Sequence, residues 1–430
     1  MKYLLFVCYA LFVSCADNST SNKSFNSNAE VIEAIREKLN EYYINPERVD
    51  SICNQLISNN HSGKYKDFHD EEAFAMQMHD ELRKLSGDYH FSFWYTDPKT
   101  TTNTSLLSFN QINDEEQKRM KWANYGFQKI EILSGNVGYI KLNEFSELGL
   151  GENAATSAIS AVENTNALII DLRDNLGGDP EMVKYISSYF FGEEKVHLND
   201  IYYRIDDDTE EFWTDPCVPG KKIDVPIYIL TSQSTFSAGE EFCYNLKNLK
   251  RATIIGDTTG GGAHPIRNVY LGNGFNMTIP FAKAINPITK SNWEGIGVFP
   301  HINCSSESAL NVAYKTALEN LCKSSKDSMD TFKFNWALSS INAEIHPFSY
   351  DSNYLKKFIG NFDGRSFFID SGVLQYKKGN DLFHLIPIKN NCFQIKELPF
   401  ARIRMEDSNG EISKIIVEYD NGSVVKVWPL

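Results

Sequence analysis

Residues 167–178 read ALIIDLRDNLGG, and this stretch decides the fold class. The apolar run from Ala167 to Leu172, interrupted only by Asp171, is typical of a strand buried on both faces of a sheet. A polar turn with Gly177-Gly178 follows, and Pro180 then stands where a helix begins. The stretch predicts a strand–turn–helix unit. Its turn is either a plain connection or a set of free backbone N–H groups able to receive an oxyanion.

The same alternation continues on both sides of this unit. Apolar strand-like runs occur at 137–142, 225–230 and 252–255, and helix-like runs at 155–162, 181–190 and 238–249. Strands that alternate with helices indicate an α/β core.

In the regions on either side of this core, the apolar residues recur with other spacings. Apolar residues recur every three to four positions in residues 29–88, which predicts an N-terminal domain of three short helices. Short alternating runs separated by Asn-Gly and Gly-Asn turns predict a small antiparallel β domain over residues 348–430. The core then occupies residues 89–322, and residues 323–347 are expected to be a linker.

Composition excludes several functional classes. The 430 residues contain 42 Lys and Arg against 56 Asp and Glu, a net charge of −14. Such an acidic chain is a poor candidate for binding nucleic acid through its phosphates. No group of Cys and His has metal-ligand spacing, so neither a metal nor a cofactor is expected. The sequence leaves the oligomeric state open.

The first residues predict export. Met1-Lys2 and an apolar run to Val13 are typical of a secretory signal, and Phe12-Val13-Ser14-Cys15 resembles a bacterial lipobox. We therefore expect a lipoprotein with Cys15 lipidated, periplasmic or anchored to the outer membrane, with residues 16–28 as a flexible tether. Ordinary signal cleavage is the alternative. The membrane is expected as a partner through this anchor alone. Six widely spaced cysteines remain, and free thiols are favoured over any assigned disulfide pairing.

Two further segments follow apolar strands. Residues 231–240, TSQSTFSAGE, open a helix, so a serine there is either a helix N-cap or a nucleophile stabilised by the helix dipole. Residues 256–262, GDTTGGG, lack the Lys of a phosphate-binding loop and are expected to wall a cleft. A serine nucleophile needs a base, and the residues alone leave both His90 and His264 open.

Four motifs occur in order and together resemble the catalytic core of the C-terminal processing (tail-specific) serine peptidases. The branch is that of the tricorn core and the interphotoreceptor retinoid-binding proteins. The motifs are VGYI at 137–140, DLRDNLGG at 171–178, TFSAGE at 235–240 and WEGIGVFP at 293–300. The helical region ending in GDYH at 87–90 is similar to the N-terminal domain of that branch. The resemblance covers about residues 29–305 and implies a crotonase-like ββα core.

The resemblance also implies a reaction, peptide-bond hydrolysis through an acyl-enzyme with a peptide or protein as substrate. Ser237 falls on the nucleophile position. His90 falls on the position of the general base, and Glu294 falls on that of a carboxylate in the network that orients the base. The N–H of Ala238 and of Gly177 or Gly178 would form the oxyanion hole.

One position disfavours the lysine base of the processing branch, and two further features depart from the family pattern. Gly262 stands where a Ser–Lys dyad would need its lysine, about 25 residues after Ser237, and Lys247 and Lys250 come too early. Tyr89 replaces the serine that precedes the histidine, so Tyr89 is expected only as a supporting residue, as is Glu240. Pro98 to Glu131 leaves no room for a PDZ module.

Two other functions compete with the peptidase hypothesis. The same scaffold could be a non-catalytic binding protein for a small apolar ligand or a peptide. An adhesion or assembly role carried by the β domain is the third hypothesis.

Overall fold

The computed structural model describes residues 25–65, 70–98, 114–348, 350, 352–408 and 411–427. The expected signal segment 1–15, Cys15 and most of the expected tether lie outside these residues. The described chain divides into two compact units. The first contains the residues up to Glu131 and Tyr139–Ala309, and the second contains Ile132–Gly138 and the residues from Leu310 onward. No helix of the described residues is long and apolar enough to cross a membrane.

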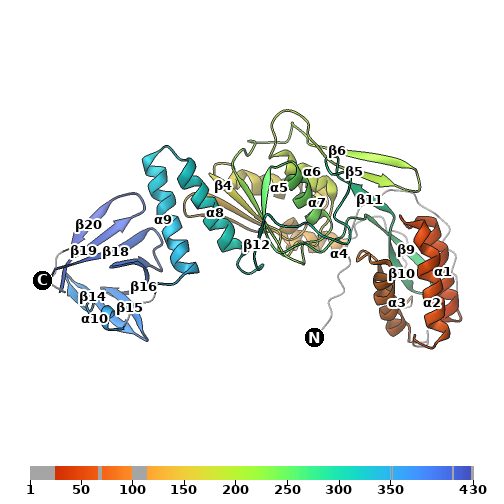
Figure 1. Cartoon of the computed structure of the whole chain (residues 1–430), viewed down its shortest axis with the longest axis horizontal. Helices are drawn as coiled ribbons and strands as arrows, with labels where there is room; N and C mark the ends of the chain where they lie inside the picture. The colour runs from red at the N-terminus through yellow and green to blue at the C-terminus, as the bar shows by residue number, and fades with distance from the viewer. Residues whose placement is uncertain are drawn as a thin grey trace. The chain divides into compact units, whose positions relative to one another are not determined.

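Three helices begin the first unit: α1 (Asn28–Tyr42), α2 (Val49–His61) and α3 (Glu71–Ser86). They pack beside a three-stranded sheet of order β1-β10-β9, formed by Ser92–Tyr95, Phe275–Pro280 and Ile266–Gly272 (Figure 1). One buried core joins helices and sheet, with Leu39, Phe74 and Phe275 among its members. The helical region is therefore completed by strands that lie about 200 residues later in the chain. Phe25, within the expected tether, is buried in this core.

A six-stranded sheet of order β12-β8-β7-β4-β3-β2 forms the α/β core. Strands β4, β7, β8 and β12 run parallel to one another, so their carboxyl ends lie at one edge. In chain order, the six strands are β2 (Phe127–Leu133), β3 (Val137–Leu142), β4 (Ala167–Asp171), β7 (Ile227–Thr231), β8 (Ala252–Gly256) and β12 (Ile302–Asn303). The associated helices are α4 (Asp114–Trp122), α5 (Leu148–Val162), α6 (Pro180–Ser188) and α7 (Ala238–Asn248). The predicted mixed α/β fold is confirmed.

A third sheet in this unit has the order β11-β5-β6 and is antiparallel. Its strands are Ala282–Ile285, His197–Tyr203 and Asp208–Trp213. Together with β9 and β10, strand β11 carries the chain from the α/β core to the helices and back.

The second unit contains an eight-stranded antiparallel sheet in which β13 to β20 follow one another in sequence order. The strands are Gly360–Phe362, Arg365–Asp370, Val373–Lys378, Asp381–Lys389, Cys392–Ile395, Ala401–Ser408, Glu411–Tyr419 and Val424–Val427. Helices α8 (Ala309–Ser324), α9 (Ser328–Ile345) and α10 (Ser352–Lys356) precede it.

Residues 323–347 differ from the expected linker, because most of them form α9. Asp327 caps this helix by accepting hydrogen bonds from the N–H groups of Met329 and Asp330. Phe334 and Trp336 are buried, and the Trp336 indole donates to the carbonyl of Pro399 at 3.0 Å. The helix is therefore packed against the β sheet within its own unit.

Candidate active site

Ser237 is the N-cap residue of α7, at the end of the loop that follows β7. Its backbone has φ +51° and ψ −122°, a conformation that costs a non-glycine residue about 1–3 kcal/mol. Gly177 lies directly against it, since a Cβ on Gly177 would fall 2.8 Å from the Cβ of Ser237. The two motifs that the sequence singled out therefore meet at one point.

The glycine pair presents one free backbone donor beside Ser237. The Gly177 N–H already donates to Oδ1 of Asn175 at 2.9 Å. Among the described residues, the N–H groups of Gly178 and Ala238 have no acceptor. Gly178 has φ +136° and could not carry a side chain, because a Cβ would fall 1.9 Å from the carbonyl oxygen of Phe145. Gly178 and Ala238 therefore offer the unpaired N–H groups at this place.

Glu240, in the first turn of α7, fixes the loop around Ser237. Its completely buried carboxylate accepts the N–H of Ser237 at 3.0 Å and those of Gly261 and Gly262 at 2.7 Å each. It also accepts the hydroxyl of Thr259. Burial raises the pKa of Glu240 to about 7, even though these four hydrogen bonds lower it. Glu240 thus joins the serine to the glycine loop.

The glycine loop is held from its other side by residues 293–297. The Trp293 indole donates to the carbonyl of Gly262 at 2.6 Å, and the Ala263 N–H donates to Oε2 of Glu294 at 2.6 Å. A Cβ on Gly262 would lie 2.6 Å from Cε1 of His90 and would meet the ring of Phe236. Gly262 is required here for close packing, which explains why a lysine does not occupy this position.

Four side chains, which we call the Asp88 cluster, meet beside this loop: Asp88, His90, His264 and Glu294. Asp88 Oδ2 lies 2.7 Å from Nδ1 of His264, and Asp88 Oδ1 lies 3.6 Å from Nδ1 of His90. Glu294 Oε2 lies 3.6 Å from Nδ1 of His264. Glu294 therefore contacts His264 rather than His90, the partner that the resemblance implied.

The environment shifts the pKa of every member of this cluster. Burial raises the pKa of Asp88, but hydrogen bonds with His264 and His90 outweigh it and leave a lowered pKa. Burial lowers the pKa of His90. Burial also lowers that of His264, but Asp88 and then Glu294 reverse the effect, so that its pKa is raised. The pKa of Glu294 is raised to about 7, mainly by burial.

The sequence gives Asp88 no role of its own, because it is read only as part of the motif that ends in His90. It leaves His264 open as a base, and the position of His264 shortly after the glycine loop is the signal that favours it. Tyr89, expected as a supporting residue, is 56% exposed and forms no hydrogen bond with a described residue.

A pocket of about 30 Å³ lies in front of Ser237. Gly178, Ala238, His264 and Trp293 are among its lining residues, and Glu241 forms another part of the wall. Burial raises the pKa of Glu241 to about 8. The buried side chains of Asn199 and Asn245 approach this carboxyl, but the Nδ2 atoms of both lack a partner of ordinary hydrogen-bond geometry. The pocket thus combines a hydroxyl, an imidazole and a buried acid.

Glu241 makes the stability of the first unit depend on pH. The folded protein holds its proton more tightly than the unfolded chain, where the pKa is 4.5, so stability falls as pH rises from about 4.5 to 8. The full effect is on the order of a few kcal/mol, at about 1.4 kcal/mol per pKa unit.

We expect Glu241→Gln to raise the thermal midpoint at pH 8 relative to the wild type, and to change it less at pH 5. Calorimetry at both pH values measures this, with Glu152→Gln on the exposed surface of α5 as control; equal shifts at both pH values would contradict it.

Two groups of side chains have the spacing of metal ligands. Asp88, His264 and Glu294 each place one ligand atom within 4.8 Å of the others, as do His197, Asp200 and Glu211. Neither group was foreseen from the sequence, where a metal was not expected. The 2.7 Å separation of Asp88 Oδ2 from His264 Nδ1 is that of a hydrogen bond, with a proton between the two atoms.

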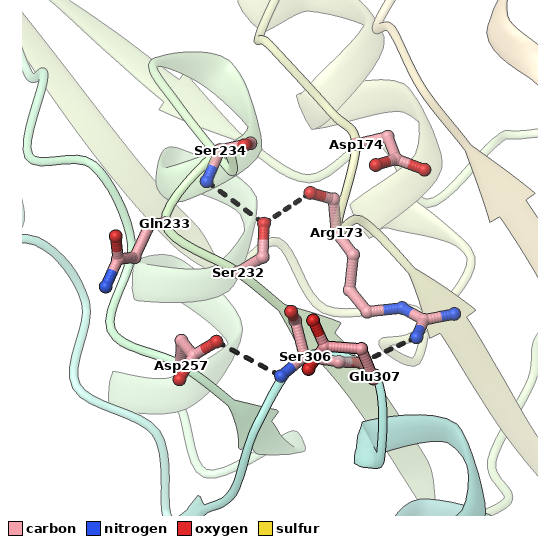
Figure 2. Close-up of a pocket in the computed structure, with 8 residues that line it drawn as sticks. All are labelled: Arg173, Asp174, Ser232, Gln233, Ser234, Asp257, Ser306 and Glu307. Carbon is pink, nitrogen blue, oxygen red and sulfur yellow. Dashed lines mark hydrogen bonds between the residues drawn. The ribbon is translucent and has the colours of Figure 1, made fainter.

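A larger pocket, of about 530 Å³, opens at the carboxyl edge of the parallel strands (Figure 2). Hydrogen bonds along its wall tie the site loops together. The Ser232 hydroxyl donates to the carbonyl of Arg173 at 2.5 Å and accepts the Ser234 N–H at 3.0 Å (Figure 2). The Arg173 guanidinium donates to the carbonyl of Ser306 at 2.6 Å. These bonds fix the nucleophile loop against the glycine turn.

Parts of the chain are similar to known peptidases. Residues 136–304 match the model of peptidase family S41, and residues 26–129 match that of the N-terminal domain of peptidase S41 in eukaryotic IRBP. The chain is 28% identical over 163 residues to the carboxy-terminal processing protease CtpB of Bacillus subtilis, covering 38% of this chain and 32% of that protein. It is 30% identical over 132 residues to the tricorn protease of Thermoplasma volcanium, covering 31% and 12%.

The chain spans about a third of the length of the curated relatives that it matches first. Among solved structures, a putative peptidase from Parabacteroides merdae aligns with a TM-score of 0.49 and 19% identity, over 68% of this chain and 98% of that one. A lipoprotein from Streptococcus agalactiae aligns with a TM-score of 0.45 and 13% identity, over 69% and 98%.

Proposed function

We propose that this chain, whose residues 136–304 match the model of peptidase family S41, is a serine-type peptidase that hydrolyses peptide bonds through an acyl-enzyme. The observation that carries the proposal is the position of Ser237. Ser237 lies at the start of α7 and lines a pocket. Gly178, Ala238 and His264 line the same pocket. A nucleophile, two unpaired backbone donors and an imidazole are the parts that acyl transfer requires.

In this proposal the Ser237 hydroxyl attacks the carbonyl carbon of the scissile bond. The oxygen of that carbonyl becomes negatively charged and accepts hydrogen bonds from the N–H groups of Gly178 and Ala238. Each such donor typically contributes about 3 kcal/mol to the stabilisation of the transition state. The Gly177 N–H is already bonded to Asn175, so we assign the first donor to Gly178 rather than to Gly177.

The Asp88 cluster supplies the general base in this proposal. The resemblance gives that role to His90 and the orienting role to Glu294, and both belong to the cluster. A histidine base suits a neutral working pH without a large change in pKa. Glu240 supports the site by holding the backbone of Ser237 against the glycine loop.

The remaining parts of the proposal come from the sequence. The core would be crotonase-like, with a helical domain before it and a β-rich domain after it. Cys15 would carry a lipid that anchors an exported enzyme to a membrane. The expected tether of residues 16–28 would be shortened to residues 16–24, because Phe25 is buried in the core of the first unit. The substrate would be a peptide or protein.

A fluorophosphonate, which reacts with activated serines, tests the proposal directly. We expect the full chain to form one adduct, mapped by mass spectrometry to Ser237. Absence of an adduct on the folded protein would favour the alternative, a binding protein on the same scaffold, and co-purified apolar ligands would then be sought.

If a lysine were the general base instead of a histidine, substitution of that lysine would slow the labelling of Ser237. Lys250 lies two residues after the end of α7, and Lys247 donates to the carbonyl of Phe299 at 2.6 Å. We expect Lys250→Ala to change the rate of fluorophosphonate labelling by less than about twofold, because a solvent-exposed side chain outside the site contributes little. A loss of 100-fold or more would reinstate a lysine-based mechanism.

A further inference from the structure

We infer that His264, oriented by Asp88, is the imidazole that takes the proton from Ser237, and that His90 does not. The inference rests on the proposed function and deepens it, since it names the base of that site. It begins from the pocket in front of Ser237, whose wall includes His264 but not His90. A general base must line the same pocket as the nucleophile and the substrate.

The bond to Asp88 prepares His264 for this task. Asp88 Oδ2 accepts the proton on Nδ1 at 2.7 Å, so the neutral ring carries its lone pair on Nε2. Within the described part of the chain, the hydrogen bond of the His264 ring is made by Nδ1 and not by Nε2. Asp88 is itself fixed, because its N–H donates to the Ser86 hydroxyl at 3.0 Å and its Oδ1 accepts the His90 N–H at 2.9 Å. His264 and Ser237 line the same pocket, so the Asp88 carboxylate, the His264 imidazole and the Ser237 hydroxyl would have the roles of a serine-hydrolase triad.

His90 has a different environment. Its side chain is 1% exposed, and both ring nitrogens are buried without a hydrogen bond. Its ring packs on that of Phe236, with 4.6 Å between centroids. Its main-chain groups are used structurally: the N–H donates to Asp88 Oδ1, and the carbonyl accepts the Thr278 hydroxyl at 2.6 Å. The backbone N–H of His90 therefore helps to hold the Asp88 carboxylate in place, and we assign His90 as a positioning residue.

The proton balance follows from this arrangement. As Ser237 Oγ forms its bond to the substrate carbonyl carbon, the hydroxyl proton moves to Nε2 of His264, and the ring becomes an imidazolium paired with Asp88. The imidazolium then gives the proton to the departing amine nitrogen as the C–N bond breaks. A water molecule repeats the sequence on the acyl-enzyme: it loses a proton to His264, releases the carboxylic acid and returns the proton to Ser237.

The labelling rate of Ser237 by a fluorophosphonate, measured from pH 5 to 9, tests the inference. The charged groups that face His264 are Asp88, Glu294 and Lys283, with His90 beyond Asp88. We expect the labelling rate of the wild type to fall at low pH, with an inflection that marks protonation of the base. His264→Ala should lower the rate at pH 7 by 100-fold or more and abolish the inflection, and imidazole in the buffer should restore part of the rate.

His90→Ala should lower the rate by less than tenfold and keep the inflection. His264→Gln provides a variant of similar volume if His264→Ala is misfolded, and His61→Ala on the exposed end of α2 is the control. An inflection that survives in both His264 variants, or that disappears in His90→Ala, would overturn the inference. A wild-type chain that forms no adduct at Ser237 would instead contradict the proposed function, so the two failures are distinguishable.

Discussion

Ser237→Ala is expected to reduce peptide hydrolysis by roughly 10⁶-fold while leaving the fold intact. Removal of the nucleophile from a serine-peptidase site has an effect of this size, and the residual rate comes from the oxyanion hole and substrate binding. The alanine keeps the Cβ and the backbone of the N-cap position, where φ is +51°. The strain at this residue therefore stays the same, and the thermal midpoint should change by only a few degrees.

The measurement is the release of new amino groups from a library of unfolded protein fragments. Ser234→Ala provides a matched control, since it removes a hydroxyl from the same loop but on the side of the larger pocket (Figure 2). Its activity should remain within a few-fold of that of the wild type. Hydrolysis by Ser237→Ala at a tenth of the wild-type rate or more would show that another residue is the nucleophile.

The fold of the core could be predicted because its signals are local. Residues 167–180 contain a buried strand, its turn and the first residue of a helix within fourteen positions, and the structure has β4 and the start of α6 there. The Asn-Gly and Gly-Asn turns of the last 80 residues similarly indicated an antiparallel sheet, which is present as β13 to β20. Helix α9 was missed because its capping residue, Asp327, lies in a polar stretch that was interpreted as a linker.

The parts that could not be predicted depend on contacts between distant residues. The helical region is completed by β9 and β10, and Ser92 in β1 pairs with Thr278 in β10. The same pairing brings the turn that carries Asp88 and His90 to the glycine loop, where Asp88 meets His264 across 176 positions. Neither hydrophobic period nor local motif encodes such a meeting, so the residues alone left His90 and His264 as equal candidates.

Glu240→Ala is expected to have the second largest effect, because this carboxylate is the shared acceptor of the loop around Ser237. The substitution removes the acceptor of three backbone N–H groups, those of Ser237, Gly261 and Gly262, in a place with no access to solvent. Each buried donor left without a partner costs about 1–3 kcal/mol. The free energy of unfolding of the first unit should therefore fall by about 3–9 kcal/mol, and a loss above about 4 kcal/mol is rare for a single substitution.

Glu240→Gln separates the hydrogen bonds from the shape of the side chain. The amide keeps one oxygen acceptor and the volume of the side chain, but its NH₂ group would face an N–H of the loop. We expect a loss of stability between those of the wild type and Glu240→Ala, and a slower labelling of Ser237 because the serine backbone is no longer tied to Gly262. Urea unfolding and fluorophosphonate labelling measure the two effects. A Glu240→Ala protein as stable as the wild type would show that the loop finds other acceptors, and the role of Glu240 as the fixed point between Ser237 and the glycine loop would then be lost.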